Sequence, residues 1–221
     1  MPNPVAPSAI ASDREETIIE WFQRNSRQVT IAAAIIGVAV VVYWFYTRSV
    51  EIKNQNAERA FNLALSSLQA QNAALAQSDL KKVLDRYGDT QAGIEAGMVL
   101  AQLRIEAGLI DSALVVLEKL TGRRAASVHL PAIYSLMGDA QLQARRPADA
   151  AKSYQKAADA TKLTRERAWQ LAKVARALTQ AGDVAGATRV WEGLANDPQA
   201  PGLSNEAKVR LGELLAKPAK G

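Results

Sequence analysis

The sequence predicts an all-α protein, in which one N-terminal transmembrane helix precedes an α-solenoid of antiparallel helix pairs and a C-terminal capping helix. Three observations predict this class. Residues 28–47 form a run of 20 residues without a charge. Small residues recur at intervals of 37 along the rest of the chain. After residue 50 the sequence is rich in alanine and poor in β-branched runs, a composition that favours helices. The 221 residues suffice for an anchor and one domain of ordinary size.

The N-terminal tail divides into two parts. Residues 1–11 hold three prolines and no charge, and we expect them to be disordered or clamped by a partner. A capping-box pattern at Ser12 predicts a short amphipathic helix over 12–27, which would lie in the lipid headgroup region. Trp21 and Phe22 belong to its apolar side. A simple extension of the transmembrane helix is the alternative.

The uncharged run 28–47 matches the thickness of a bilayer, because 20 helical residues span about 30 Å. A buried helix of a soluble protein would show a polar stripe, and this run has none. A signal peptide would have a shorter apolar core that ends in small residues. We therefore predict a retained anchor. Its membrane-interface residues are expected to be Trp21, Phe22, Tyr43, Trp44, Phe45, Tyr46 and Arg48.

The orientation of this span follows only in part from charge. Basic residues flank both ends in equal number, with Arg14, Arg24 and Arg27 before the span. Long C-terminal domains are translocated largely regardless of charge, so we expect a cytoplasmic N-terminus and a periplasmic domain at a bacterial inner membrane.

A repeat of 37 residues fills residues 50–216. Each unit has a small residue on a first helix, a small residue on a second helix and a large residue four positions further on. The first set is Ala64, Ala101, Gly138, Ala175 and Gly212; the second is Ala76, Ala113, Ala150 and Ala187; the large residues are Leu80, Leu117, Tyr154 and Trp191. Small residues let two helices approach closely, and such units bury their apolar faces only by stacking.

Turn residues mark the ends of these helices. Gly108 and Gly182 stand where first helices should end, and Pro147 and Asp183 where second helices should begin. The pattern also predicts a capping half-unit over 203–216 and a frayed tail over 217–221.

This small–small–large pattern resembles the tetratricopeptide repeat (TPR), with two departures. Its period is 37 residues, whereas the family's is about 34. Its first unit carries "LQAQNAALAQSDL" where a glycine turn is expected. We therefore predict TPR-like helix pairs.

Residues for catalysis or for a cofactor do not form a motif in this sequence. Without cysteine the chain has no disulfide, iron–sulfur cluster or thiolate zinc site. His129 is the single histidine, and we expect a solvated loop residue there. Phosphate-binding loops and hydrolase motifs are missing. The net charge of +5 comes from interleaved charges, which indicate a solvated surface. We predict a non-enzyme without cofactor, nucleic-acid partner or small-molecule substrate.

Function should therefore lie on a surface, and in TPR proteins this is the concave groove lined by first helices. The corresponding positions here include Phe61, Glu95, Met98, Gln102, Asp139, Trp169 and Arg176. Trp169 and Arg176 are the strongest candidates, because Trp and Arg dominate binding hot spots. Alternatively, Trp169 packs between units.

The layout also resembles a bacterial single-span family, that of the ancillary SecYEG translocon subunit (YfgM-type). The resemblance is carried by "EWFQRN" before the span, "NAERAFNLAL" after it and "GDVAGATRVWEGLAND" in the last full unit. It implies a scaffold at the periplasmic face that binds translocon subunits, periplasmic chaperones or emerging chains. The alternative function is a structural accessory subunit of a large photosynthetic or respiratory membrane complex. In either case the partners are membrane-complex subunits, periplasmic proteins and the lipid bilayer.

Overall fold

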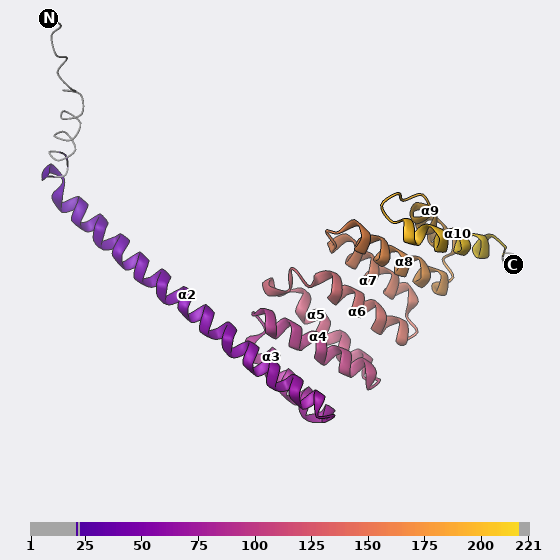
Figure 1. Cartoon of the computed structure of the whole chain (residues 1–221), viewed down its shortest axis with the longest axis horizontal. Helices are drawn as coiled ribbons and strands as arrows, with labels where there is room; N and C mark the ends of the chain where they lie inside the picture. Colours follow the sequence, from indigo (N-terminus) through magenta and orange to yellow (C-terminus); the bar gives the residue numbers. More distant parts are fainter. Residues whose placement is uncertain (1–20, 22, 217–221) are drawn as a thin grey trace, which may run out of the picture. The chain divides into compact units, whose positions relative to one another are not determined.

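The computed structural model describes residue 21 and residues 23–216, and every regular element in this part is a helix (Figure 1). The chain divides into a unit that ends at Ile52 and a second unit that begins at Lys53. The predicted tails 1–11 and 217–221, most of the predicted helix 12–27 and the anchor residue Phe22 lie outside the described residues.

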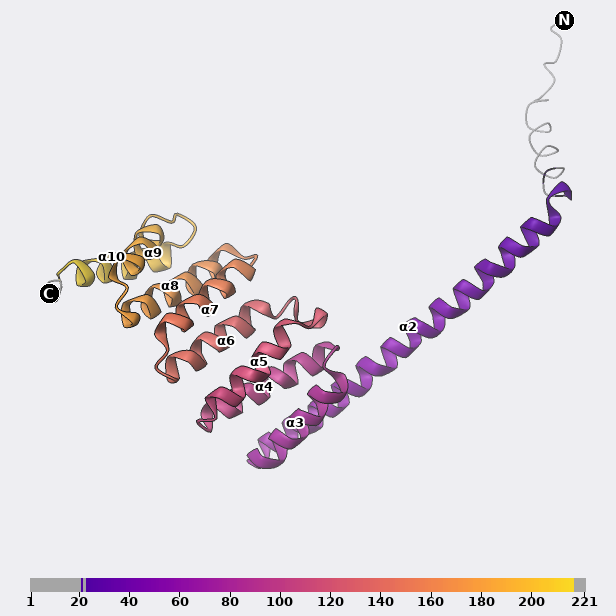
Figure 2. The same cartoon turned by 180° about the vertical axis from the view of Figure 1, so that it is seen from behind.

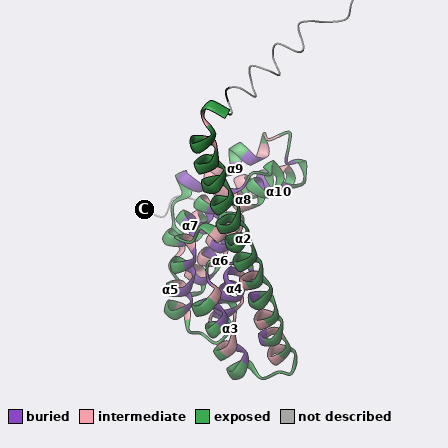
Figure 3. Ribbon diagram, turned by 90° about the vertical axis from the view of Figure 1, so that its left-hand side faces the viewer, coloured by how far each residue is buried: buried purple, intermediate pink, exposed green. Residues whose placement is uncertain are grey.

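Helix α2 runs without interruption from Ser26 to Gln69 and contains the whole predicted span. In its apolar part no side chain is buried, and Figure 3 shows this stretch as exposed along its length. Tyr43, Trp44, Phe45 and Tyr46 are all more than half exposed. The long apolar helix predicted near the N-terminus is thus confirmed as a helix.

The second unit consists of successive antiparallel pairs, visible in order from magenta to yellow in Figure 1 and from behind in Figure 2. The C-terminal part of α2 packs on α3 (Ala73–Tyr87). The following pairs are α4 (Gln91–Glu106) with α5 (Ile110–Thr121), α6 (Leu130–Gln143) with α7 (Pro147–Ala160), and α8 (Thr164–Ala181) with α9 (Val184–Ala195). A 3₁₀ turn, η1 (Arg124–Ala126), precedes α6, and α10 (Pro201–Ala216) closes the array.

The predicted register is confirmed by burial. The small residues of both sets are fully buried up to Ala187, and the large residues Leu80, Leu117, Tyr154 and Trp191 are at most 1% exposed. Gly212 is the exception. It is exposed, because α10 packs on the preceding pair and no second helix of its own unit follows it in the described part of the chain.

The third unit combines its smallest residue with a large one. A Cβ added to Gly138 would lie 2.6 Å from Cδ1 and 2.7 Å from Cζ of Tyr154, and real Cβ atoms essentially never approach within 3.0 Å. The first two units place alanine and leucine at these positions, as in Ala101 and Leu117. The close approach of α6 and the Tyr154 ring therefore requires glycine at residue 138.

The four turns inside the pairs share one backbone conformation. Gln71, Gly108, Arg145 and Gly182, each 37 residues apart, have positive φ angles of 58°, 76°, 59° and 82°. In each turn the next N–H donates to the carbonyl five residues earlier, as Asp183 does to Leu178 at 3.0 Å. This is the Schellman arrangement that ends a helix at a left-handed residue. The first unit keeps this turn although it lacks the glycine.

Helix starts follow the predicted signals. The Asp183 carboxylate accepts a hydrogen bond from the Gly186 N–H at 2.8 Å, which makes it the N-cap of α9. Pro147 is the first residue of α7. Thr90 caps α4 in the same way, through the Gly93 N–H at 3.1 Å.

Candidate partner-binding groove

The predicted groove residues lie on the first helices of the pairs, at fixed offsets from the buried small residue. Glu95 and Trp169 stand six positions before it, Phe61 and Met98 three before it, and Gln102, Asp139 and Arg176 one after it. Since the register is confirmed by burial, these side chains occupy equivalent places on successive helices. Ser135 and Ala172, which also stand three positions before the small residue of their helices, are buried.

The N-terminal half of this surface is partly closed by packing. Phe61 and Met98 are half-buried against the core that includes Leu84, Leu100 and Leu117. Gln102 is exposed, and its amide donates to Glu106 at 2.9 Å on the same helix. Phe61 and Met98 therefore hold α2 and α4 in the array as much as they line a surface.

Glu95 lies close to the single histidine. His129 immediately precedes α6, with its Nε2 atom 3.8 Å from the Glu95 carboxylate and 3.1 Å from the side-chain nitrogen of Gln91. Its side chain is only 21% exposed. His129 lies in the connection, as predicted, but the prediction that it is solvated was wrong, because its side chain contacts Gln91 and Glu95 of α4.

Asp139 is the centre of a network that joins three helices. It accepts a hydrogen bond from the Tyr154 hydroxyl at 2.6 Å and another from the Lys173 ammonium at 3.1 Å. Lys173 also donates to the Ser135 hydroxyl at 2.9 Å and lies 5.1 Å from the centre of the Tyr154 ring. Asp139 thus links α6, α7 and α8, and its carboxylate is occupied by these two donors.

Electrostatics keep the Tyr154 phenol of this network in one protonation state. Burial raises the pKa of the Tyr154 phenol, and the hydrogen bond to Asp139 and its negative charge raise the pKa further. The phenol is therefore a neutral donor across the physiological range. This arrangement stabilises the stacking of units.

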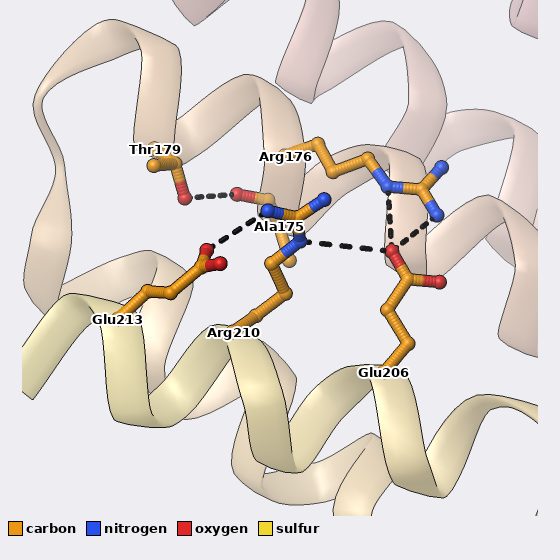
Figure 4. A network of polar contacts seen from close by, with 6 residues as sticks. All are labelled: Ala175, Arg176, Thr179, Glu206, Arg210 and Glu213. Atoms are coloured by element: carbon orange, nitrogen blue, oxygen red, sulfur yellow. Dashed lines mark hydrogen bonds and ion pairs between the residues drawn. The ribbon is translucent and has the colours of Figure 1, made fainter.

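Arg176 lies at the C-terminal end of the surface, in the ladder of charges shown in Figure 4. Its guanidinium donates to the Glu206 carboxylate through Nη2 at 2.6 Å and Nε at 3.2 Å. Arg210 lies 3.8 Å from the same carboxylate and donates to Glu213 at 2.8 Å. The positive charges of the two arginines are neutralised by the negative charges of the two glutamates. The ladder therefore holds α10 on α8 and is not a strong anion site.

A small pocket of about 250 Å³ opens beside this ladder, lined in part by Arg176, Thr179, Trp191 and Leu214. Its wall combines apolar groups with guanidinium groups that are each partly exposed. Such a pocket fits one partner side chain.

Trp169 lines a second pocket of about 320 Å³, together with Arg165 and the connection around Pro201 and Gly202. Its indole is 51% exposed. The indole therefore packs in part against the connection before α10 and leaves about half of its surface exposed. An exposed indole beside a hollow is typical of a binding hot spot.

The predicted groove residues fall into two groups with different surroundings. Arg176 and Trp169 lie on one side of α8 and each borders a pocket, whereas the N-terminal candidates contribute to packing. Sequence reasoning missed Glu206 and Lys173. Glu206 could have been found, because it stands six positions before Gly212 and so continues the register of Glu95 and Trp169.

Among residue 21 and residues 23–216, no group of three or more histidine, cysteine or acidic side chains could hold a metal ion.

Comparisons with known proteins agree with this architecture. A family model described as tetratricopeptide repeat-like domain matches residues 20–133. Curated protein sequences give no significant match. Among solved structures, the nearly identical TPR-like repeats of a kinesin light chain-type protein from Podosopora anserina have a TM-score of 0.51 at 17% identity, over 74% of this chain and 94% of that one. Pseudomonas aeruginosa PilF gives a TM-score of 0.44 at 13% identity, over 74% and 86%.

The likeness to the Podosopora repeats concerns the fold alone. The family match covers more than half of the sequence, including the apolar run and the first two helix pairs. The chain belongs to the tetratricopeptide repeat-like domain family.

Proposed function

We propose that this protein is a non-catalytic scaffold, anchored in a bacterial inner membrane by α2, that binds protein partners near the translocon at the periplasmic face. The anchor is the observation that carries the proposal. The apolar part of α2 has no buried residue, and 20 uncharged residues in water would expose a large apolar surface at high cost. A bilayer removes that cost.

Two observations favour a retained anchor over a signal sequence. The family match begins at residue 20, before the apolar run, so this run belongs to the matched domain. In addition, α2 continues without a break from the apolar residues to Ala57 and Ala64, which are fully buried in the repeat domain.

The binding surface in this proposal is the groove of first helices, with Trp169 and Arg176 as its principal contacts. TPR domains act through protein partners, and the two pockets beside these residues offer places for partner side chains. The resemblance to the translocon-associated family supplies the identity of the partners, and the periplasmic orientation follows from it.

The partners are tested by purification of C-terminally tagged full-length protein from membranes in mild detergent, followed by mass spectrometry. We expect Sec subunits or periplasmic chaperones in the wild-type sample and their loss with Trp169→Ala. Val115→Ala is a matched control, because Val115 is 52% exposed and lies on the second helix α5. Stoichiometric respiratory or pigment-binding subunits would refute the translocon assignment and support the accessory-subunit alternative.

The orientation is tested separately by protease treatment of spheroplasts. We expect digestion of the domain after residue 50 when only the outer face is accessible. Full protection of that domain, with digestion after the membrane is permeabilised, would contradict the periplasmic placement.

A further inference from the structure

The largest of the hollows described here lies on the opposite side of α8 from the predicted groove. This hollow, the α7–α9 cleft, has a volume of about 640 Å³ and is bordered by α7, α8 and α9. On α8 it is lined by Val174, Leu178 and Ala181. At about 100° per residue these positions point about 120–180° away from Trp169 and Arg176.

The base of the α7–α9 cleft is apolar. Ala151 and Val174 form its deepest part, and the half-buried Leu178 and Val190 form its sides. From Ala148 to Gln155 the cleft extends along two turns of α7, about 10 Å. This length and volume suit two or three apolar side chains on one face of a short helix.

A comparison with the residues at equivalent positions one unit earlier explains why this space is open. One unit earlier, the positions of Ala151 and Val174 are occupied by the larger Leu114 and Met137, which pack on the core. There the positions of Leu178 and Val190 hold Gln141 and Ser153, joined by a hydrogen bond of 2.6 Å.

An ion pair also bridges the earlier unit and is missing from the later one. Asp111 on α5 lies 3.3 Å from Arg146 at the start of α7. The residues 37 positions later are Ala148 and Asp183. Ala148 carries no charge, and the Asp183 carboxylate caps α9 instead. The space between α7 and α9 therefore lacks both the large side chains and the ion pair that are present at the corresponding place one unit earlier.

The edges of the cleft carry two basic side chains, Arg189 and Lys152, beside the Asp183 carboxylate, which is engaged in capping α9. Arg189 on α9 forms no hydrogen bond or ion pair with any residue in the described part of the chain, and it borders the apolar base directly. Lys152 lies on the α7 edge, in an exposed pair with Asp149 that is easily exchanged for another carboxylate. A guanidinium without a partner at the rim of an apolar cleft favours a ligand that brings its own carboxylate.

We propose that the α7–α9 cleft is a second docking surface, which binds a short amphipathic helix of a partner protein whose apolar face is flanked by Asp or Glu. The apolar side chains enter between α7 and α9, and a flanking carboxylate pairs with Arg189. This surface is independent of the groove on the first helices, so one chain can hold two partners on opposite sides of α8.

Two synthetic peptides test the proposal. Both are fluorescein-labelled helices of about 14 residues with leucines at i, i+3, i+4 and i+7, one with glutamates at the remaining flanking positions and one with lysines. Each is titrated by fluorescence anisotropy against full-length protein in phosphatidylcholine nanodiscs. We expect saturable binding of the glutamate peptide and at least about ten-fold weaker binding of the lysine peptide.

Three variants locate the binding. Ala151→Leu fills the cleft with the residue that the previous unit already accommodates, and we expect at least about ten-fold weaker binding of the glutamate peptide. Arg189→Glu leaves the base intact, and we expect it to reverse the preference in favour of the lysine peptide. Trp169→Ala alters the groove only and should leave both affinities unchanged.

Several results would overturn the proposal. These are no saturable binding of the glutamate peptide to the wild-type chain, equal binding to Ala151→Leu, or an unchanged preference in Arg189→Glu. Loss of binding in Trp169→Ala would assign the peptide to the groove. Self-association of the wild-type chain that Arg189→Glu abolishes would identify a second copy as the occupant.

Discussion

The pairing of Gly138 with Tyr154 leads to a prediction whose magnitude follows from the contacts. In Gly138→Ala the new Cβ would lie 2.6 Å from Cδ1 of the ring, and a normal separation of about 3.5 Å requires a displacement of about 1 Å. The ring cannot move freely, because its hydroxyl donates to Asp139 at 2.6 Å and Lys173 lies above its face. Overpacking of this kind costs about 1–3 kcal/mol.

Helix propensity opposes this cost, since alanine is favoured over glycine inside a helix by about 0.5–1 kcal/mol. We therefore expect Gly138→Ala to lower the free energy of unfolding by about 1–2 kcal/mol. In the background of Tyr154→Leu the sign should reverse, because the ring is gone and the pair becomes the Ala–Leu combination of Ala101 and Leu117. There the same substitution should stabilise by about 0.5–1 kcal/mol.

The measurement is a double-mutant cycle on the full-length chain in detergent, with urea unfolding followed by far-UV circular dichroism. The expected coupling energy is about 2 kcal/mol. Equal effects of Gly138→Ala in both backgrounds would refute the steric argument, as would a stabilisation in the wild-type background.

Three further predictions concern turns, caps and charge. At the left-handed turn residues, Gly182→Ala should lower and Arg145→Gly should raise the free energy of unfolding, each by about 1 kcal/mol; equal signs in urea titrations would contradict this. Asp183→Ala removes the cap of α9 and should destabilise by about 1 kcal/mol, while Asp183→Asn should have little effect on the same titrations. The hydrogen bond and charge of Lys53 hold the pKa of Asp89 below its usual value, so this pair contributes a small stabilisation above about pH 4 that is lost as the pH falls through the folded-state pKa. Lys53→Met should raise the pKa of Asp89 measured by carboxyl NMR, and an unchanged pKa would contradict the assignment.

The register of the repeat could be predicted because close helix packing limits residue size at the same place in every unit. The recurrence of small residues at Ala64, Ala101 and Gly138 indicates that limit directly in the sequence. The left-handed turns were only half predictable. Gly108 and Gly182 signal them, but Gln71 and Arg145 adopt a positive φ without a glycine, so residue type alone does not reveal these two turns.

Contacts between units were harder to predict, because they do not follow the 37-residue spacing. Lys173 and Asp139 are 34 residues apart, and Arg176 and Glu206 are 30 apart. Such pairs depend on how one helix is offset from the next, which residue size does not encode. The exposure of Trp169 likewise depends on the path of the connection before α10.

The identical turns at Gln71, Gly108, Arg145 and Gly182 also make the domain modular in a practical sense. A chain cut after one of these residues and joined after another keeps the same local backbone at the splice, because both sites share one conformation. Deletion of residues 109–145 would connect Gly108 directly to Arg146, the residue that follows the next turn. The reach of this domain can therefore be shortened or lengthened by engineering in whole units, without designing a new junction.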